Sequence, residues 1–325
     1  MRTISRSAVA LSTMALASAG LALGAGSASA ALTTYCDGEA AGVTVPGDLV
    51  VAKNTSCVLT DVTIEGEVRV QSGGDLLVTD TSVAERVVVQ ADGYFDGTGA
   101  EIGGNVVSKG GYGVYLDAST VGGSYVGRAA EDAEPFLYSY DTAIDGRVTV
   151  AQGLVHLQTV TVGGHLTSEN SLYTDILDST ISRDLTVTGA AEGTALCGSE
   201  VDGAATYTGN AGVQIGTGGA LIDCEDANYL GGDLSIWDST DGVDVTDNII
   251  RGDLAGSGND PAPTGADNRV RGEASGQFAE LAPAASAMST RSSTQDHQQE
   301  LDGKRAERRG SAEEAAEIAG PANLR

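Results

Sequence analysis

The chain has 325 residues, of which 45 are acidic and 18 are Lys or Arg, so its formal net charge at pH 7 is −27. A protein this acidic repels phosphate backbones, which argues against nucleic acid as a partner and favours cations, basic partners or simple solubility. Only 4% of the residues are aromatic, too few for an ordinary globular core of this length, so we expect a core of Val, Leu and Ile.

Residues 1–30 have the pattern of a cleaved secretory signal peptide. Arg2 and Arg6 precede an apolar run, and Ala28-Ser29-Ala30 supplies the small residues of a cleavage site. A membrane-spanning helix is the alternative, but the run is rich in Ala, Gly and Ser, and no second run of spanning length follows. We therefore expect a mature chain that is secreted and extracellular, with no membrane span.

From residue 45 onward, one apolar position recurs with a period near 19 residues, and apolar and polar residues alternate within each copy. This combination is the signature of a strand solenoid. The recurring apolar residues, called anchors below, are Val45, Ile64, Val83, Ile102, Val121, Ile144, Val162, Ile181, Val201, Leu230, Ile250 and Val270.

Fixed distances from the anchor define the other parts of each copy. Apolar residues four and six positions after the anchor, and five and seven positions before it, should face inward on two strands. The position two after the anchor is glycine in ten copies, and we expect a corner with positive φ there, with Glu85 and Arg183 as strained exceptions. These glycines are Gly47, Gly66, Gly104, Gly123, Gly146, Gly164, Gly203, Gly232, Gly252 and Gly272.

Two polar columns precede the anchor. Small polar residues two positions before it, including Asn228, Asn248 and Asn268, should stack and form hydrogen bonds along the solenoid. Aspartates three positions before it, such as Asp61 and Asp80, should cap their own turns.

The repeat, the glycine corner and the Asn ladder resemble the right-handed parallel β-helix of the pectate-lyase-like superfamily. The segment from Asn248 to Phe278 also resembles the C-terminal coils of uncharacterised secreted actinobacterial proteins, in which cysteines are expected near the positions of Gly256 and Phe278. The resemblance implies an all-β, single-stranded right-handed parallel β-helix of about 12 coils over residues 31–281. It implies an architecture and not an activity.

Four cysteines form two pairs along the chain. Cys36 and Cys57 lie 21 residues apart, and Cys197 and Cys224 lie 27 apart across a lengthened copy. Each pair should therefore meet on adjacent coils as a disulfide, as exported proteins allow. A zinc site is the alternative, but no Cys-x-x-Cys or His spacing supports it.

Residues 282–325 lack the repeat and are rich in Ala, Ser, Gln, Glu and Arg. We expect a disordered, charged tail, with a short polar helix over 305–318. A docked cap is the alternative.

The position six before the anchor should face outward, and in five successive coils it carries aromatic, acidic or His residues. Strands about 4.8 Å apart make this a row of about 20 Å, comparable with a few sugar units. Rings beside carboxylates and amides suit a carbohydrate, although outward Tyr also fills strand surfaces. The candidate ligand-binding residues are Asp96, Tyr115, Tyr138, His156 and Asp175, flanked by Asp117, Tyr140 and Gln158.

Catalytic and metal-binding signals are sparse. Lyases of this fold use a calcium-holding Asp cluster with an Arg or Lys base, and the motifs of the hydrolases do not occur here. His156 beside Asp175 could act as an acid–base pair, although such neighbours are usually surface pairs. Asp223, Glu225 and Asp226 form a candidate calcium site without the spacing of a known motif. We expect no other cofactor.

The sequence favours a secreted, non-catalytic β-helix that acts as a structural or adhesive surface module and contacts polysaccharide, or another cell-surface component, through its outward Tyr, His and Asp face. The alternative is a polysaccharide lyase or glycoside hydrolase of the same fold.

Overall fold

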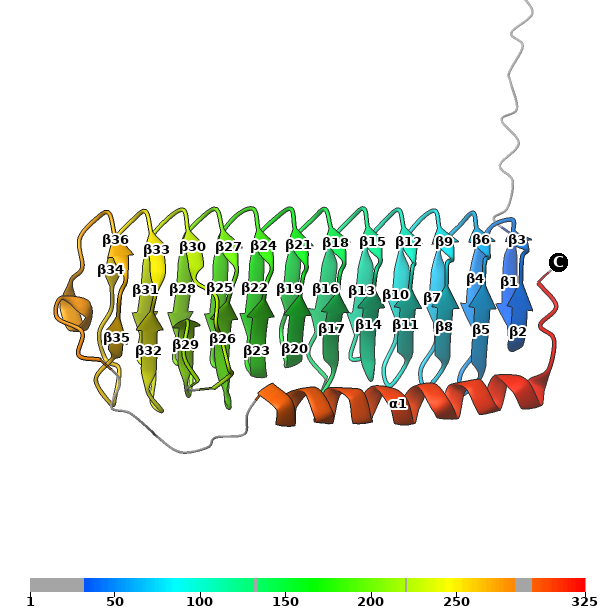
Figure 1. Ribbon diagram of the computed structural model, residues 1–325. Coiled ribbons are helices and arrows are strands. Elements are labelled where there is room, and N and C mark those ends of the chain that lie inside the picture. Colours follow the sequence, from blue (N-terminus) through cyan, green and yellow to red (C-terminus); the bar gives the residue numbers. More distant parts are fainter. Residues whose placement is uncertain (1–31, 131–133, 220, 284–293, 325) are drawn as a thin grey trace, which may run out of the picture. The chain divides into compact units, whose positions relative to one another are not determined.

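The computed structural model describes residues 32–130, 134–219, 221–283 and 294–324 of the chain (Figure 1). The predicted signal peptide, residues 1–30, lies outside the described residues. Three parallel sheets of 12 strands each form a right-handed β-solenoid, and each coil contributes one strand to every sheet. The predicted fold class and number of coils are confirmed.

Sheet A consists of β1 (Thr33–Cys36), β4 (Asp48–Val51), β7 (Val68–Val70), β10 (Val87–Val89), β13 (Val106–Lys109), β16 (Tyr125–Arg128), β19 (Val148–Val150), β22 (Leu166–Glu169), β25 (Leu185–Thr188), β28 (Ala205–Thr208), β31 (Leu234–Trp237) and β34 (Leu254–Ala255). Sheet B consists of β2 (Gly38–Ala41), β5 (Ser56–Thr60), β8 (Asp75–Thr79), β11 (Tyr94–Thr98), β14 (Gly113–Asp117), β17 (Phe136–Tyr140), β20 (Gly153–Gln158), β23 (Ser171–Leu177), β26 (Gly193–Cys197), β29 (Val213–Gly216), β32 (Val243–Thr246) and β35 (Thr264–Ala266). Sheet C consists of β3 (Thr44–Val45), β6 (Thr63–Ile64), β9 (Ser82–Val83), β12 (Glu101–Ile102), β15 (Thr120–Val121), β18 (Ala143–Ile144), β21 (Thr161–Val162), β24 (Thr180–Ile181), β27 (Glu200–Val201), β30 (Asn228–Leu230), β33 (Asn248–Ile250) and β36 (Arg269–Val270).

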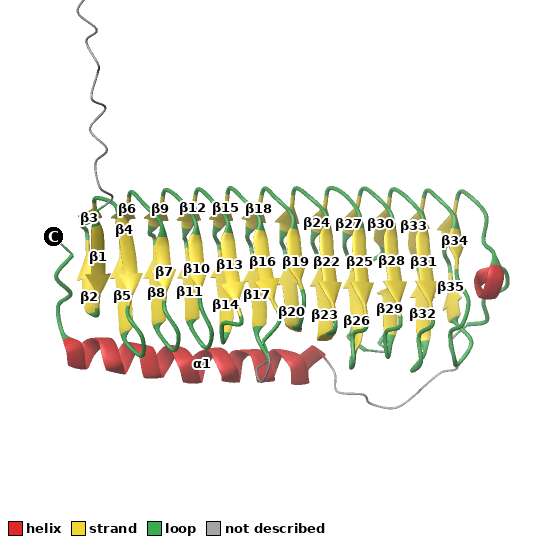
Figure 2. Ribbon diagram, turned by 180° about the vertical axis from the view of Figure 1, so that it is seen from behind, coloured by secondary structure: helices red, strands yellow, loops and turns green. Residues whose placement is uncertain are grey.

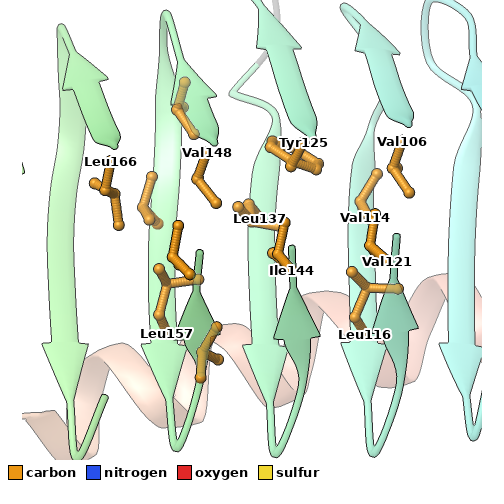
Figure 3. Close-up of a cluster of buried hydrophobic side chains, with 14 of the residues drawn as sticks. Val106, Val114, Leu116, Val121, Tyr125, Leu137, Ile144, Val148, Leu157 and Leu166 are labelled. Carbon is orange, nitrogen blue, oxygen red and sulfur yellow. The ribbon is translucent and has the colours of Figure 1, made fainter. Parts of the chain in front are cut away.

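The core is a set of aliphatic columns that run along the solenoid. Val68, Val87 and Val106 pair in register on successive coils, and all three are fully buried. Figure 3 shows side chains of this kind pointing inward from strands of all three sheets. Because each aliphatic side chain packs on its equivalent in the next coil, the core needs few rings, as the composition indicated.

Of the ten glycines in the column after the anchor, Gly47 has the predicted positive φ (125°), and the other nine have a different physical cause. Gly66 and Gly252 do not have positive φ, and neither do Glu85 and Arg183. A Cβ on Gly66 would instead lie 2.5 Å from the carbonyl carbon of Gly47 on the neighbouring coil. Glycine is therefore favoured in this column because the backbones of adjacent coils approach closely, although Glu85 and Arg183 occupy two of its positions.

The left-handed corner lies in the aspartate column three positions before the anchor. Asp61, Asp80 and Asp267 have φ of 53°, 48° and 57°. Asp and Asn tolerate this region better than other residues with a Cβ because their short polar side chains form local hydrogen bonds. The aspartates thus occupy the strained position that we had assigned to the glycines.

The two predicted disulfides, Cys36–Cys57 and Cys197–Cys224, are present. The first joins β1 to β5 on the next coil, at the N-terminal end of the solenoid. The second joins β26 to the long insertion of its lengthened copy, where Gly218 and Cys224 form an antiparallel bridge.

The C-terminal residues differ from the disordered tail that we expected. Residues 294–319 form one helix, α1 (Thr294–Ala319), which is much longer than the predicted helix over 305–318 and contacts β2, β5 and β8 of sheet B (Figure 2). Residues 284–293 lie outside the described residues. A short 3₁₀ helix, η1 (Gly276–Phe278), follows the last coil, and the side chain of Phe278 packs on the core.

The Asn ladder is present at the C-terminal coils and is fully buried at Asn248. The side-chain amide of Asn248 donates to Asn268 Oδ1 (2.9 Å) and to the carbonyl of Ile215 (2.9 Å), and its Oδ1 accepts from Asn228 (3.0 Å). Asn248 therefore links three coils through one side chain.

We predict that Asn248→Ala lowers the free energy of unfolding of the C-terminal coils by about 2 kcal/mol, because several buried polar groups lose their partner at once. Urea denaturation followed by fluorescence of Trp237, the single tryptophan, measures this change. Thr206→Ala, on the outer face of β28, is the control and should change little. Equal effects of the two substitutions would show that the ladder is not a source of stability.

Candidate functional site

The predicted row of outward residues exists on sheet B. Asp96 pairs in register with Tyr115, Tyr115 with Tyr138, Tyr138 with His156, and His156 with Asp175. The flanking residues Asp117, Tyr140 and Gln158 also pair in register with one another. All of them lie outside the aliphatic core of the solenoid.

The row is not an open surface, in contrast to our expectation. Tyr115 is 7% exposed, Tyr138 1%, Asp175 2%, and Asp96 and His156 are fully buried. Asp117, Tyr140 and Gln158 are partly exposed at the margin. Helix α1 packs against this face of sheet B (Figure 1). The residues chosen as a ligand-binding row therefore form a second buried layer.

The second layer is aromatic on the side of the solenoid and has small or aliphatic residues on the side of the helix. Leu301 and Ala312 of α1 are buried in one cluster with Tyr94, Phe136 and Tyr138. The rings of Phe136 and Tyr138 are stacked with their centroids 4.2 Å apart. The aromatic residues missing from the core are thus concentrated under the helix.

Asp96 is the centre of the contact between α1 and the solenoid. Its carboxylate accepts hydrogen bonds from Tyr94 Oη (2.7 Å), from Arg305 Nε (3.0 Å) and Nη2 (3.3 Å), and from Arg309 Nη1 (3.0 Å). A fully buried carboxylate is costly unless its oxygens are satisfied, and two guanidinium groups and a phenol satisfy them here. Removal of the helix would leave this charge without its two cationic partners.

Two arginines of α1 also stack on tyrosines. The guanidinium carbon of Arg305 lies 3.4 Å from the centroid of the Tyr115 ring, and that of Arg308 lies 4.9 Å from the centroid of Tyr112. Tyr112 also donates a hydrogen bond from its hydroxyl to the backbone carbonyl of Lys304 (3.2 Å). Planar guanidinium groups bind carboxylates and ring faces at the same time, which lysine cannot do equally well.

Arg308 forms a second ion pair nearer the N-terminal end of the solenoid. Its Nε donates to Asp75 Oδ1 (2.7 Å), and its Nη2 donates to the carbonyl of Asp92 (2.9 Å). Burial raises the pKa of Asp75 above its ordinary value of 3.8, even though Arg308 acts to lower it. A cleft of about 560 Å³ remains beside this pair, lined in part by Asp75, Asp92, Tyr112 and Glu307.

The other end of the row contains the proposed acid–base neighbours. His156 and Asp175 lie side by side in register, and both are buried. The ring of Tyr140 lies 5.4 Å from that of His156. His165 and Asp184 are exposed neighbours on the next two coils: Nδ1 of His165 lies 3.3 Å from Oδ2 of Asp184 and accepts a hydrogen bond from the Asp184 amide (3.3 Å).

The candidate calcium residues lie in the insertion that contains Cys224. Asp223, Glu225 and Asp226 are all exposed. Within the described ranges, no group of three or more His, Cys, Asp or Glu side chains is placed to hold a metal ion. A calcium site at these residues stays a prediction. The helices of the same ranges include none that is long and apolar enough to cross a membrane.

The residues that sequence reasoning missed are on α1. Leu301, Arg305, Arg308, Arg309, Ala312 and Ala316 recur at helical spacing and form the stripe that faces the solenoid. Most of this stripe is Arg and Ala, so apolar periodicity does not detect it. The sequence signal that could have predicted docking of this helix is the helical spacing of its three arginines, together with the aspartates on the facing side of the solenoid.

A scan against models of known protein families finds no match, and neither does a search of curated proteins or of solved structures. The resemblance to the pectate-lyase-like superfamily therefore rests on the repeat and on the solenoid architecture.

We predict that Arg305→Ala weakens the docking of α1 by about 2 kcal/mol, which makes amide exchange of residues 299–319 roughly thirtyfold faster, because Asp96 loses two hydrogen bonds. Arg305→Lys should recover only part of this loss, because lysine keeps the charge but not the bidentate contact. Glu314→Ala, on the exposed side of α1, is the control. If Arg305→Ala matches the control, the ion pairs do not hold the helix.

A second prediction concerns pH. Because the folded-state pKa of Asp75 lies above 3.8, the folded protein binds a proton at this site more readily than the unfolded chain. The wild type should therefore gain stability relative to Asp75→Asn as the pH falls through the raised pKa, and lose it as the pH rises. Unfolding free energies measured across this range test the sign.

The control for the pH experiment is Thr206→Ala on the outer face of β28, because this substitution removes no titratable group. The difference in unfolding free energy between this variant and the wild type should vary little across the same pH range. A stability difference for Asp75 that grows toward neutral pH would mean that Arg308 outweighs burial.

Proposed function

We propose that this protein is a secreted, non-catalytic structural or adhesive module, and that the Tyr and Asp face of sheet B binds polysaccharide when α1 leaves it. The observation that carries the proposal is the position of Arg305. Its guanidinium lies on the ring of Tyr115 while it forms hydrogen bonds with Asp96. A ring face beside a carboxylate is the combination that a sugar unit uses, through its CH face and its hydroxyls.

The shape of the face supports a chain-like ligand rather than a small one. The row from Asp96 to Asp175 crosses five coils in register, which is about 20 Å along the solenoid. Rings of Tyr115, Tyr138 and Tyr140 recur along it. A linear polysaccharide aligned with the solenoid axis could contact several of them in succession.

In the closed molecule, α1 competes with such a ligand. The polysaccharide must replace the arginine contacts to Asp96 and Asp75. Only molecules with an undocked helix can bind it, so its apparent affinity is the intrinsic affinity multiplied by the fraction of molecules in that state. The cleft beside Tyr112 and Asp75 gives a first sugar unit access while the helix is still in place. The helix therefore acts as an intramolecular competitor.

The rest of the molecule supports a structural role outside the cell. Two disulfides are typical of oxidising, extracellular settings. The solenoid stacks one aliphatic core through 12 coils, which produces a stable scaffold with repeating outer faces. The function thus depends on what the outer faces contact and needs no catalytic group.

Retention on immobilised acidic and neutral polysaccharides tests the proposal. The full chain should be retained weakly, and the double variant Arg305→Ala/Arg309→Ala should be retained more strongly, because its helix docks less often. Addition of Tyr115→Ala to the double variant should abolish the gain. Glu314→Ala/Glu317→Ala, which changes only exposed charges of α1, should behave like the wild type.

Equal retention of the wild type and the arginine variant would contradict competition by α1. No retention of any variant would contradict polysaccharide binding on this face. Release of soluble sugar products that is lost in His156→Ala would replace the proposal with an enzymatic one.

A further inference from the structure

The last described residues pair with the first coil through an isolated β-bridge. The amide of Glu39 in β2 donates to the carbonyl of Gly320 (2.9 Å), and the amide of Ala322 donates to the carbonyl of Glu39 (2.7 Å). Glu39 and Pro321 form a parallel bridge, the same orientation that joins successive coils. Residues 320–324, called the cap strand below, therefore cover the outer edge of β2 at Glu39.

The cap strand also covers the end of the core. Leu324 is 4% exposed and belongs to the aliphatic core cluster, and Ala322 packs against the same cluster. Gly320, with φ of 79°, ends α1 and directs the chain onto β2. Because the cap strand follows α1 directly, docking of α1 places the cap strand at the edge of β2.

The opposite end of the solenoid is closed by its own neighbouring residues. The amide of Leu254 donates to the carbonyl of Glu273 (3.0 Å), and the amide of Gly265 donates to the carbonyl of Ala282 (2.9 Å). Phe278 is 2% exposed and packs on the core there. This closure does not involve α1, so the two ends of the solenoid are protected independently.

We propose that the edge of β2 is an interaction surface for a second copy of this chain, occupied by the cap strand in the closed molecule. An uncovered strand edge presents unpaired N–H and C=O groups that readily pair with another chain. Two copies of one edge, related by a two-fold axis, pair antiparallel and bury the exposed ends of their cores against each other. The proposal is independent of polysaccharide binding.

The closed opposite end fixes the size of the assembly. Since residues 273–282 cover the last coil, copies that meet at β2 cannot extend further, and association stops at a head-to-head dimer. Glu39 is exposed on β2, so the pairing brings like charges of two copies together. The dimer should therefore form more readily at high ionic strength, where this repulsion is screened.

Sedimentation velocity of the chain lacking residues 321–325 tests the proposal. The full chain should sediment as a monomer, and the shortened chain should form a concentration-dependent dimer that salt favours. Leu324→Asp, which keeps the full length but disfavours burial of the cap strand, should shift the equilibrium in the same direction. A peptide with the sequence of residues 319–325 should return the shortened chain to the monomer by occupying the β2 edge.

Two results would overturn the proposal. A shortened chain that stays monomeric at every salt concentration, with faster amide exchange in β2, would make the cap strand a stabilising element only. Open-ended chains of many copies would mean that the last coil takes part, which excludes the head-to-head arrangement.

Discussion

The structure depends on the in-register, parallel stacking of successive coils. Each residue lies on its equivalent in the next coil, about 4.8 Å away. A residue type is therefore suitable at a given position only if copies of it can stack at this spacing. Aliphatic side chains do so by packing, as in the column of Val68, Val87 and Val106. Glycines such as Gly66 do so because a Cβ would collide with the neighbouring backbone, and Asn248 does so by forming hydrogen bonds along the column.

The same stacking creates the need for α1. Asp75 and Asp96 lie on sheet B among tyrosines and other apolar residues, where a carboxylate is poorly solvated. The arginines of α1 supply the opposite charges and stack on Tyr112 and Tyr115. Arginines on the inner side of one helix thus compensate the buried carboxylates of the solenoid, and that helix covers the aromatic face of sheet B.

The two proposals involve the same C-terminal segment, but they depend on different chemical groups of the solenoid. Under the first proposal, the rings and carboxylates of sheet B contact either the helix or a polysaccharide. Under the second, the backbone groups at the edge of β2 pair either with the cap strand or with another copy. Both surfaces are occupied by residues 299–324 in the closed molecule. One C-terminal segment therefore covers both of these surfaces of the solenoid.

The sequence by itself determined the solenoid, its coil length, both disulfides and the row from Asp96 to Asp175, because a repeat of about 19 residues fixes which positions share a face. It misassigned the left-handed corner, since glycine is required both for positive φ and for close backbone approach, and a pattern does not separate these causes. Only the tertiary structure decided that the row is buried. The contact between Arg305 and Asp96 joins positions 209 residues apart, beyond the reach of any local sequence pattern. The face of α1 that packs on the solenoid consists mostly of Arg and Ala, so it has no apolar periodicity by which the sequence could reveal it.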